Sequence, residues 1–196
     1  KIIFYKYLFN KTQLLTISKT EYFKLRSLLT NIKVKYIPFG VDDKFWFPEQ
    51  KSKSEKYVLA IGNDMARDWK ILVKAWDETF PMLKIVTSLP VLTNKKNIDV
   101  IKGNWHSQAL TDAEIRNLYR NSEFVVLPVR ETFQPSGQST CLQAMACSKA
   151  VLISNIQGIW DRELLKNGEN IFFYKTGDIE DLNKSINFLA KNTKLR

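Results

Sequence analysis

The sequence has few of the residues that build metal centres and disulfide frameworks. Its 196 residues include one histidine, His106, and two cysteines, Cys141 and Cys147. The cysteines are six positions apart in one expected helix, which puts them on different faces and argues against a disulfide between them. We therefore predict reduced thiols in a reducing compartment. No partner spacing supports a zinc site or a Ser-His pair at His106, so the sequence predicts no metal site.

Long apolar runs are also missing. No stretch approaches the roughly 20 apolar residues that a membrane helix needs, and no signal peptide is visible. We therefore expect a cytoplasmic protein. The chain begins with Lys1 rather than Met, so we also expect a fragment or a trimmed form of a longer protein.

Basic residues are in surplus, and most of the surplus lies near the amino terminus. There are 30 Lys and Arg against 20 Asp and Glu, a net charge of +10. Residues 1–56 hold 12 of the basic residues and 5 of the acidic ones. This surplus attracts a phosphorylated substrate or the anionic inner face of a membrane, or it is simply a solvated surface. A nucleic-acid partner is not expected, because no known nucleic-acid motif occurs and the aromatic residues lie within apolar runs.

Short β-branched runs alternate with segments of helical period. With 44% hydrophobic residues, the chain can bury a substantial core. The expected strands are 14–17, 34–37, 57–61, 83–86, 98–101, 124–127, 151–153 and 171–174. The expected helices are 20–29 with Thr20 as its cap, 69 to about 80, 111–120 with a Thr111-x-x-Glu114 capping box, one from about 141, a short one within 158–165, and 178–192.

The six strands from residue 57 onward alternate with helices. This order predicts the α/β class, with a Rossmann-like, doubly wound parallel sheet. Residues 49–56 are polar and lack an apolar period, so we expect a domain boundary near residue 50. The expected domains are an incomplete one at 1–50 and a larger one at 51–196. Residues 2–9 are apolar and aromatic, and we expect a helix or a strand there.

One loop, residues 128–139, leaves the carboxyl end of a buried strand and enters a helix. Open α/β sheets bind ligands at such places. Ser136 and Gly137 favour a turn, and the N–H groups of Gly137, Gln138 and Ser139 would point outward toward an anion, assisted by the helix dipole. The alternative is an ordinary strand–helix turn.

A second loop, residues 62–70, follows another expected strand. Gly62 permits a close backbone approach, Arg67 can hold a phosphate with two hydrogen bonds, and Lys70 is a compact positive charge. Asp68 fits a helix cap. The alternative is that both basic side chains are merely solvated. If the two loops face a common cleft, both could bind a phosphate there.

Five segments, in order, resemble the motifs of group 1 glycosyltransferases of family 4. They are PFGVDDKFWFP, IGNDMARDWKILVKAW, LTDAEIRNLYRNSEFVVLP, LQAMACSKAVLISNIQG and LLKNGENIFFY, and the resemblance covers residues 36–190. The resemblance implies the GT-B fold, two Rossmann-like domains with a cleft between them, of which this chain would supply the carboxyl-terminal, donor-binding half. It also implies a nucleotide-sugar donor, a sugar, glycan or lipid acceptor, retention of anomeric configuration, and no cofactor or required metal.

The resemblance also assigns roles by position. Arg67 and Lys70 match the basic residues that hold the donor diphosphate, and the family's other basic position, beside Gly62, is Asn63 here. Gly137 to Ser139 would present N–H groups to the same anion. Gln143 matches the second Glu of a Glu-x7-Glu motif that binds the ribose, and the segment Gly103, Asn104 and Trp105 lies near the nucleotide base.

Some positions depart from the family pattern. Pro135 stands where the first Glu of the motif is expected, and Glu131 replaces it only if the loop is longer. Ser148 stands where the family has Gly. Residues 1–50 resemble only the end of the amino-terminal domain, so we expect the isolated chain to bind nucleotide weakly and to transfer nothing. The alternatives are a non-catalytic nucleotide- or sugar-binding module of the same fold and a GT-B sugar epimerase.

Overall fold

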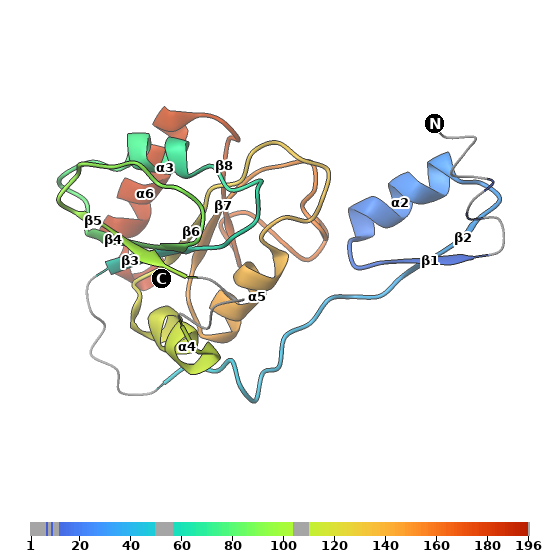
Figure 1. Ribbon diagram of the computed structural model, residues 1–196, viewed down its shortest axis with the longest axis horizontal. Coiled ribbons are helices and arrows are strands. Elements are labelled where there is room, and N and C mark those ends of the chain that lie inside the picture. Colours follow the sequence, from blue (N-terminus) through green and yellow to red (C-terminus); the bar gives the residue numbers. More distant parts are fainter. Residues whose placement is uncertain (1–6, 8, 10–11, 50–56, 104–109, 196) are drawn as a thin grey trace.

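The computed structural model describes residues 7, 9, 12–49, 57–103 and 110–195 (Figure 1). Most of the apolar stretch 2–9, most of the expected linker, and Asn104, Trp105 and His106 lie outside these residues, so the predictions made for them are not addressed. Among the described residues, no helix is both long enough and apolar enough to cross a membrane.

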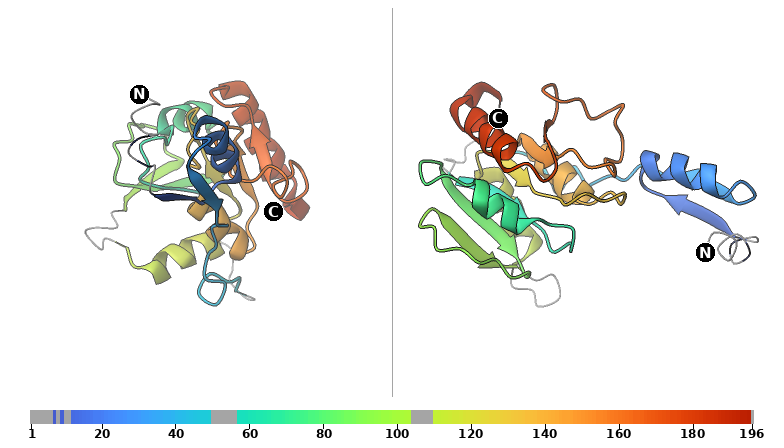
Figure 2. Two further views of the ribbon diagram at one scale, coloured as in Figure 1. Left: turned by 90° about the vertical axis from the view of Figure 1, so that its right-hand side faces the viewer. Right: turned by 90° about the horizontal axis from the view of Figure 1, so that it is seen from above.

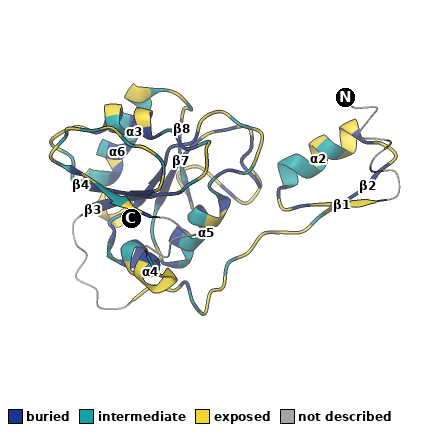
Figure 3. Ribbon diagram, viewed as in Figure 1, coloured by how far each residue is buried: buried dark blue, intermediate teal, exposed yellow. Residues whose placement is uncertain are grey.

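A small βαβ unit opens the described chain. Strand β1 (Gln13–Thr16) and strand β2 (Lys33–Tyr36) pair in parallel, and helix α2 (Lys19–Leu28) connects them. No residue of α2 is buried, and Figure 3 shows this unit largely in the colours of exposed and half-buried residues. A two-stranded parallel sheet has little core of its own.

The main body is a six-stranded parallel sheet. Its strands are β3 (Tyr57–Ile61), β4 (Met82–Thr87), β5 (Ile98–Lys102), β6 (Val125–Leu127), β7 (Val151–Ser154) and β8 (Phe172–Tyr174). They lie in the order β5-β4-β3-β6-β7-β8, and every pair is parallel. The order reverses between β3 and β6, which is the Rossmann arrangement, and the predicted fold class is confirmed.

Helices cover both faces of this sheet (Figures 1 and 2). On one face, α3 (Trp69–Ala75) and α6 (Ile179–Lys191) pack over side chains such as Val58, Ile85 and Leu152. On the other face, α4 (Asp112–Asn121) and α5 (Gln138–Ala146) pack over the alternate side chains. A short 3₁₀ helix, Thr193–Leu195, ends the described chain. All five residues of β3 are buried, as expected for a central strand covered on both faces.

Three helix predictions are corrected by the structure. Ser18, not Thr20, caps α2 by accepting from the amide of Glu21, and the Thr20 hydroxyl instead donates to the carbonyl of Ile159. Helix α3 ends at Ala75 rather than near residue 80, because Trp76 is extended and the chain turns at Asp77. Residues 158–165 form turns and no helix. There the amide of Leu165 bonds the carbonyl of Asp161, and the turn does not continue.

Residues 45–47 are fastened to α4 in what we call the Phe45–Phe47 clasp. Trp46 is buried against Tyr119, with ring centroids 5.7 Å apart. The guanidinium of Arg116 lies 4.5 Å from the centroid of Phe45, and that of Arg120 lies 4.3 Å from the centroid of Phe47. Such cation–π contacts, with a 2.9 Å bond from Arg120 Nε to the carbonyl of Phe47, fix this segment on the sheet body.

The βαβ unit touches the main body at the start of α2. The amide of Lys19 donates to the carbonyl of Trp160 at 2.8 Å, beside the Thr20–Ile159 bond. The Lys19 ammonium pairs with Glu163 and lies 4.0 Å from a carboxylate oxygen of Asp161. The contact is mainly polar, and it brings residue 17 beside the loops that leave β3 and β6.

Candidate functional site

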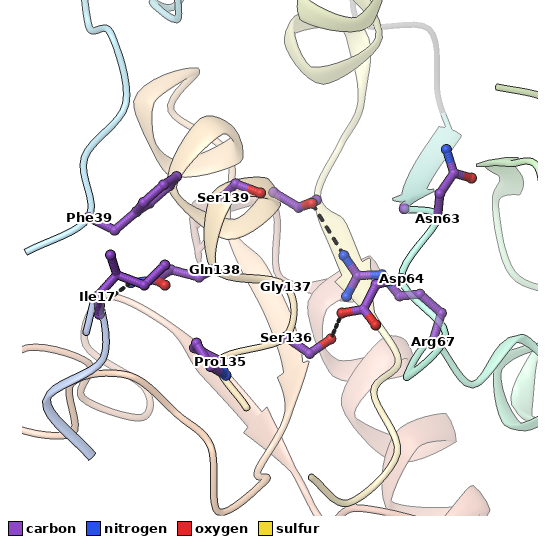
Figure 4. A pocket seen from close by; sticks show the side chains of 12 residues that line it. Ile17, Phe39, Asn63, Asp64, Arg67, Pro135, Ser136, Gly137, Gln138 and Ser139 are labelled. Carbon is purple, nitrogen blue, oxygen red and sulfur yellow. Dashed lines mark hydrogen bonds between the residues drawn. The ribbon is translucent and has the colours of Figure 1, made fainter. Parts of the chain in front are cut away.

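A hollow of about 380 Å³ lies where the strand order of the main sheet reverses. The β3–α3 loop, the β6–α5 loop and two residues of the amino-terminal unit line it (Figure 4). We call it the Arg67 hollow; its lining residues are Ile17, Phe39, Gly62, Asn63, Asp64, Arg67 and residues 135–140. The position at the carboxyl ends of two neighbouring strands is the one at which open α/β sheets bind ligands.

Arg67 is buried between the two loops. Only 3% of the surface of Arg67 is exposed. The side chain extends from the β3–α3 loop to the start of α5, where Nη2 donates to the Thr140 hydroxyl at 3.2 Å. Two glycines make room for it. A Cβ at Gly62 would overlap Nε of Arg67, and a Cβ at Gly137 would come within 2.9 Å of Nη1. Both glycines have positive φ, which other residues adopt at a cost.

The guanidinium of Arg67 lacks a full set of hydrogen-bond partners. Nε and Nη1 are buried and have no acceptor in the described part of the chain. Burial lowers the pKa of Arg67 below its ordinary value, while the carboxylate of Asp64 opposes that shift. Asp64 is exposed, and its carboxylate accepts a hydrogen bond from the Ser136 hydroxyl rather than from the Arg67 guanidinium. A buried cation with unused N–H groups is costly unless an anion compensates it.

Helix α5 points its amino end at the same hollow. Gly137 is its N-cap, with φ 84°, and no side chain caps the first turn. The uncapped N–H groups and the helix dipole favour an anion there. Gln138 is buried, and its Nε2 donates to the carbonyl of Ile17 at 3.1 Å, while its Oε1 has no donor among the described residues. This bond ties α5 to the amino-terminal unit.

Asn63 joins three strand ends beside the hollow. Its Oδ1 accepts from the Ser88 amide at 2.6 Å and from the Thr87 hydroxyl at 3.2 Å, and its Nδ2 donates to the carbonyl of Gly103 at 3.0 Å. These bonds link the ends of β3, β4 and β5. Asn63 is therefore a positioning residue for the loops, and Gly103 lies beside the hollow without lining it.

The structure brings together only some of the residues predicted from sequence. Gly62, Asn63, Arg67, Ser136, Gly137, Gln138 and Ser139 line the Arg67 hollow. Lys70 does not, because it is exposed on α3 and lines a different hollow with Trp69 and Lys74. Glu131 lies in another hollow, where its Oε1 accepts from the amide of Gln157 at 2.9 Å. Gln143 lies outside the hollow and accepts from the Tyr119 hydroxyl at 3.3 Å.

Sequence reasoning missed five lining residues: Ile17, Phe39, Asp64, Pro135 and Thr140. Asp64 and Thr140 sit within or next to the two predicted loops, so the loops themselves were the available signal. Ile17 and Phe39 come from the amino-terminal unit, and no local pattern links them to residues more than 20 positions away.

The charged and uncapped groups of the hollow are suited to an anion. Among the described residues, no group of three or more His, Cys, Asp and Glu side chains could hold a metal ion. The buried thiol of Cys141 is near Arg67, and burial raises its pKa to about 12, so it stays protonated and is a poor nucleophile at neutral pH. The positive charge of Arg67 and the amino end of α5 are left as the groups that can meet a ligand.

The comparisons with known proteins concern a family-model match and the fold. Residues 102–196 match the family model described as glycosyl transferases group 1, while no curated protein sequence matches the chain. Among solved structures, sucrose-phosphate synthase from Thermosynechococcus elongatus has a TM-score of 0.77 at 17% identity, covering 99% of this chain and 53% of that one. HepE from Anabaena, crystallised with UDP and glucose, has a TM-score of 0.74 at 15% identity, covering 99% and 58%.

A carboxyl-terminal domain alone is also similar to this chain. The C-terminal domain of a glycosyl transferase group 1 family protein from Francisella tularensis has a TM-score of 0.60 at 19% identity, covering 80% of this chain and 90% of that domain. These likenesses show the fold, the Rossmann-like half of a GT-B protein. The chain spans about half the length of the two larger structures.

Proposed function

We propose that this chain is the donor-binding half of a group 1, family 4 glycosyltransferase. In this proposal it binds a nucleotide-sugar, and the complete protein transfers the hexosyl group to a sugar, glycan or lipid acceptor with retention of configuration. The family-model match over residues 102–196 and the fold support the proposal.

The observation that carries it is the buried Arg67. Its incompletely compensated positive charge, the two glycines that make room for it and the uncapped start of α5 all lie at one hollow. A diphosphate suits this hollow better than a monophosphate, because it brings more negative charge to the guanidinium of Arg67 and the amino end of α5. HepE, which has a similar fold, was crystallised with UDP and glucose.

The transfer breaks the bond between the anomeric carbon and the diphosphate oxygen and forms one to an acceptor oxygen, which loses its proton. The departing nucleoside diphosphate gains one negative charge. Arg67 and the N–H groups of Gly137 to Ser139 would neutralise that charge as it develops, which lowers the barrier. No metal ion is needed in this scheme, because these groups supply the positive charge that one would otherwise provide.

Calorimetry with UDP, GDP and ADP tests the proposal. We expect one of these diphosphates to bind more tightly than its monophosphate. Arg67→Met should weaken that binding by about thirtyfold, because a hydrogen bond to a charged group contributes roughly 2 kcal/mol. Circular dichroism of the variant would establish that it is folded.

Lys70→Met is the matched control. It removes the same charge from the next basic position, outside the Arg67 hollow, and should leave diphosphate affinity unchanged. Equal losses in both variants, or no diphosphate binding to the parent chain, would contradict the proposal. Sugar transfer by the isolated chain would contradict the expectation that the transferase needs a further domain.

One observation favours a second candidate, a nucleotide-binding module without catalysis. Neither Glu131 nor Gln143, the residues that could serve at the family's two Glu positions, lines the hollow, and Pro135, which does, has no side-chain group that can form a hydrogen bond. Gln143 is bonded to Tyr119, and Glu131 faces another hollow. An assay of this chain joined to the amino-terminal domain that the proposal requires, with nucleotide-sugar donors, separates the two, since only the transferase releases free nucleoside diphosphate in the presence of an acceptor.

A further inference from the structure

The direction of the Arg67 guanidinium depends on the hydroxyl of Thr140. Nη2 of Arg67 donates to that hydroxyl at 3.2 Å, while Nε and Nη1 have no acceptor among the described residues. Thr140 belongs to the first turn of α5, shortly after the Gly137 cap. Whatever holds the Thr140 hydroxyl in place therefore also holds the guanidinium.

Two further polar side chains lie next to Thr140. Gln143 follows it by three positions in α5, so the two residues share one face of that helix. Tyr119 of α4 points at the same face, because its hydroxyl donates to Oε1 of Gln143 at 3.3 Å. We call the side chains of Arg67, Thr140, Tyr119 and Gln143 the Tyr119 network.

The Tyr119 phenol is buried, protonated and fixed. Tyr119 is 1% exposed, and its ring meets the ring of Trp46 edge-on with centroids 5.7 Å apart. Burial raises the pKa of Tyr119 above its ordinary value, while the charge of Arg67 and the neighbouring Thr140 hydroxyl oppose that rise. Because the phenol proton is donated to Gln143, the phenol oxygen is left as an acceptor that faces the Thr140 hydroxyl.

We propose that Thr140, Tyr119 and Gln143 are positioning residues that hold the Arg67 guanidinium against the Arg67 hollow. Each hydroxyl of the network donates one bond and accepts another, so the donors all point in one direction, from Arg67 toward Gln143. The Thr140 oxygen then keeps a lone pair for Nη2 of Arg67. The benefit to donor binding rests on the proposed function, whereas the orientation of the guanidinium does not.

This inference gives Gln143 a role other than the one the family resemblance implies. The resemblance assigns position 143 to the ribose, yet Gln143 does not line the Arg67 hollow and its Oε1 is bonded by Tyr119. A neutral amide ends the network without adding negative charge near Arg67. A carboxylate at this position would accept the same bond, but its charge would compensate the guanidinium and compete with a bound anion.

Nuclear magnetic resonance of the Arg67 Nε–H group tests the orientation without a ligand. The group is buried, so its proton should exchange slowly and give a signal that is absent from Arg67→Met. We expect Tyr119→Phe and Thr140→Val each to shift or broaden this signal. If the signal of Tyr119→Phe coincides with that of the parent chain, the inference is wrong, whatever the chain binds.

Tyr57→Phe is the matched control. It also removes a buried phenol hydroxyl that bonds α4, since the Tyr57 hydroxyl donates to the carbonyl of Leu118 at 2.8 Å. Tyr57 is the first residue of β3, at the opposite end of that strand from the Arg67 hollow. This variant should therefore leave the Arg67 signal and anion binding as they are in the parent chain, and a change equal to that of Tyr119→Phe would overturn the inference.

Calorimetry with inorganic pyrophosphate and with UDP measures the consequence for binding. Tyr119→Phe should weaken both by about threefold, because a less firmly held guanidinium binds either anion less well. Gln143→Glu should weaken both as well. Unchanged pyrophosphate affinity in Tyr119→Phe would overturn the inference. So would tighter UDP binding by Gln143→Glu with unchanged pyrophosphate binding, because Gln143 would then act on the ribose.

The two measurements separate this inference from the proposed function. If the parent chain binds neither pyrophosphate nor UDP, the proposed function fails, and the Arg67 signal alone then decides whether the Tyr119 network orients the guanidinium. If the parent binds both and the Arg67 signal is the same in Tyr119→Phe, the proposed function stands and the inference fails.

Discussion

Ser148 holds a backbone conformation that glycine prefers. Its φ is 57°, and it is the one residue other than glycine with positive φ in the described chain. It follows the C-cap of α5, where its amide bonds the carbonyl of Met145 at 2.9 Å and the next amide bonds the carbonyl of Ala144 at 3.0 Å. This pair of bonds is the Schellman motif, in which a left-handed residue ends a helix. The departure from the family's glycine noted in the sequence is thus a position of backbone strain.

We therefore expect Ser148→Gly to stabilise the protein. Relief of the left-handed strain should exceed the added entropy of a glycine in the unfolded chain, for a net gain of about 0.5 to 1 kcal/mol in the free energy of unfolding. Urea denaturation measures the change. Ser148→Ala is the control, because alanine keeps the strain, and a gain of equal size in that variant would rule out the explanation.

Single residues also mark the limit of prediction from sequence. Arg67 and Gly137 do line one hollow, while their role in donor binding remains a prediction. The sequence alone could not tell which of the two basic residues, Arg67 or Lys70, lines the hollow. Asp68 caps α3, so Arg67 precedes the helix and turns inward, whereas Lys70 is the second helical residue and turns outward. The direction of Glu131 depends on the path of a long loop, for which the sequence holds no periodic signal.

At the scale of elements, the strands were predictable because burial on both faces leaves an unbroken apolar run. The run 57–61 is β3, and the other predicted strands agree with the structure to within about a residue at each end. Helix ends were less predictable, because a cap depends on geometry as well as on residue type. Thr20 and Ser18 both suit a cap, and only Ser18 has its oxygen near a free amide of α2.

The capping box of α4 is the element whose prediction was confirmed in atomic detail. The Glu114 amide donates to the Thr111 hydroxyl at 3.2 Å, and the Thr111 amide donates to the Glu114 carboxylate at 2.7 Å. We expect Thr111→Ala to lower the free energy of unfolding by about 1 kcal/mol, because the Glu114 amide at the start of the helix loses its acceptor. Thermal unfolding measures it. Thr111→Ser keeps the hydroxyl oxygen and should change the free energy of unfolding little. If serine lowers it as much as alanine does, the lost methyl group, not the lost hydrogen bond, is the cause.

At the scale of the whole molecule, the amino-terminal unit is held to the sheet body by few groups. Lys19 makes a backbone bond to Trp160, pairs with Glu163 and lies near the buried carboxylate of Asp161. The Glu163 bond is the main reason why the pKa of Lys19 lies above its ordinary value. Pairs of exposed side chains are weak and are screened by salt, so this contact is a reversible one.

We expect Lys19→Glu to release the unit, because it places a second negative charge beside Asp161 and Glu163. Small-angle X-ray scattering should then give a larger radius of gyration at low salt. Lys33→Glu makes the same charge change on an exposed position of β2 and should leave the scattering as it is in the parent chain. Identical curves for the parent and Lys19→Glu would mean that the hydrogen bonds of the Lys19 amide, the Thr20 hydroxyl and the Gln138 side chain hold the unit without the ion pair.

The Phe45–Phe47 clasp restricts where the chain can bend. Before the clasp, the last fixed point of the amino-terminal unit is Ile37, whose amide bonds the carbonyl of Thr16 at 2.9 Å. The pivot between the two parts is therefore confined to about residues 38–41, where Gly40 has no neighbour within 4 Å of an added Cβ. Phe39, which lines the Arg67 hollow, lies on that pivot. A rotation of the amino-terminal unit about these residues therefore moves Ile17 and Phe39, which line the Arg67 hollow. The width of the hollow thus depends on the angle between the two parts of the molecule.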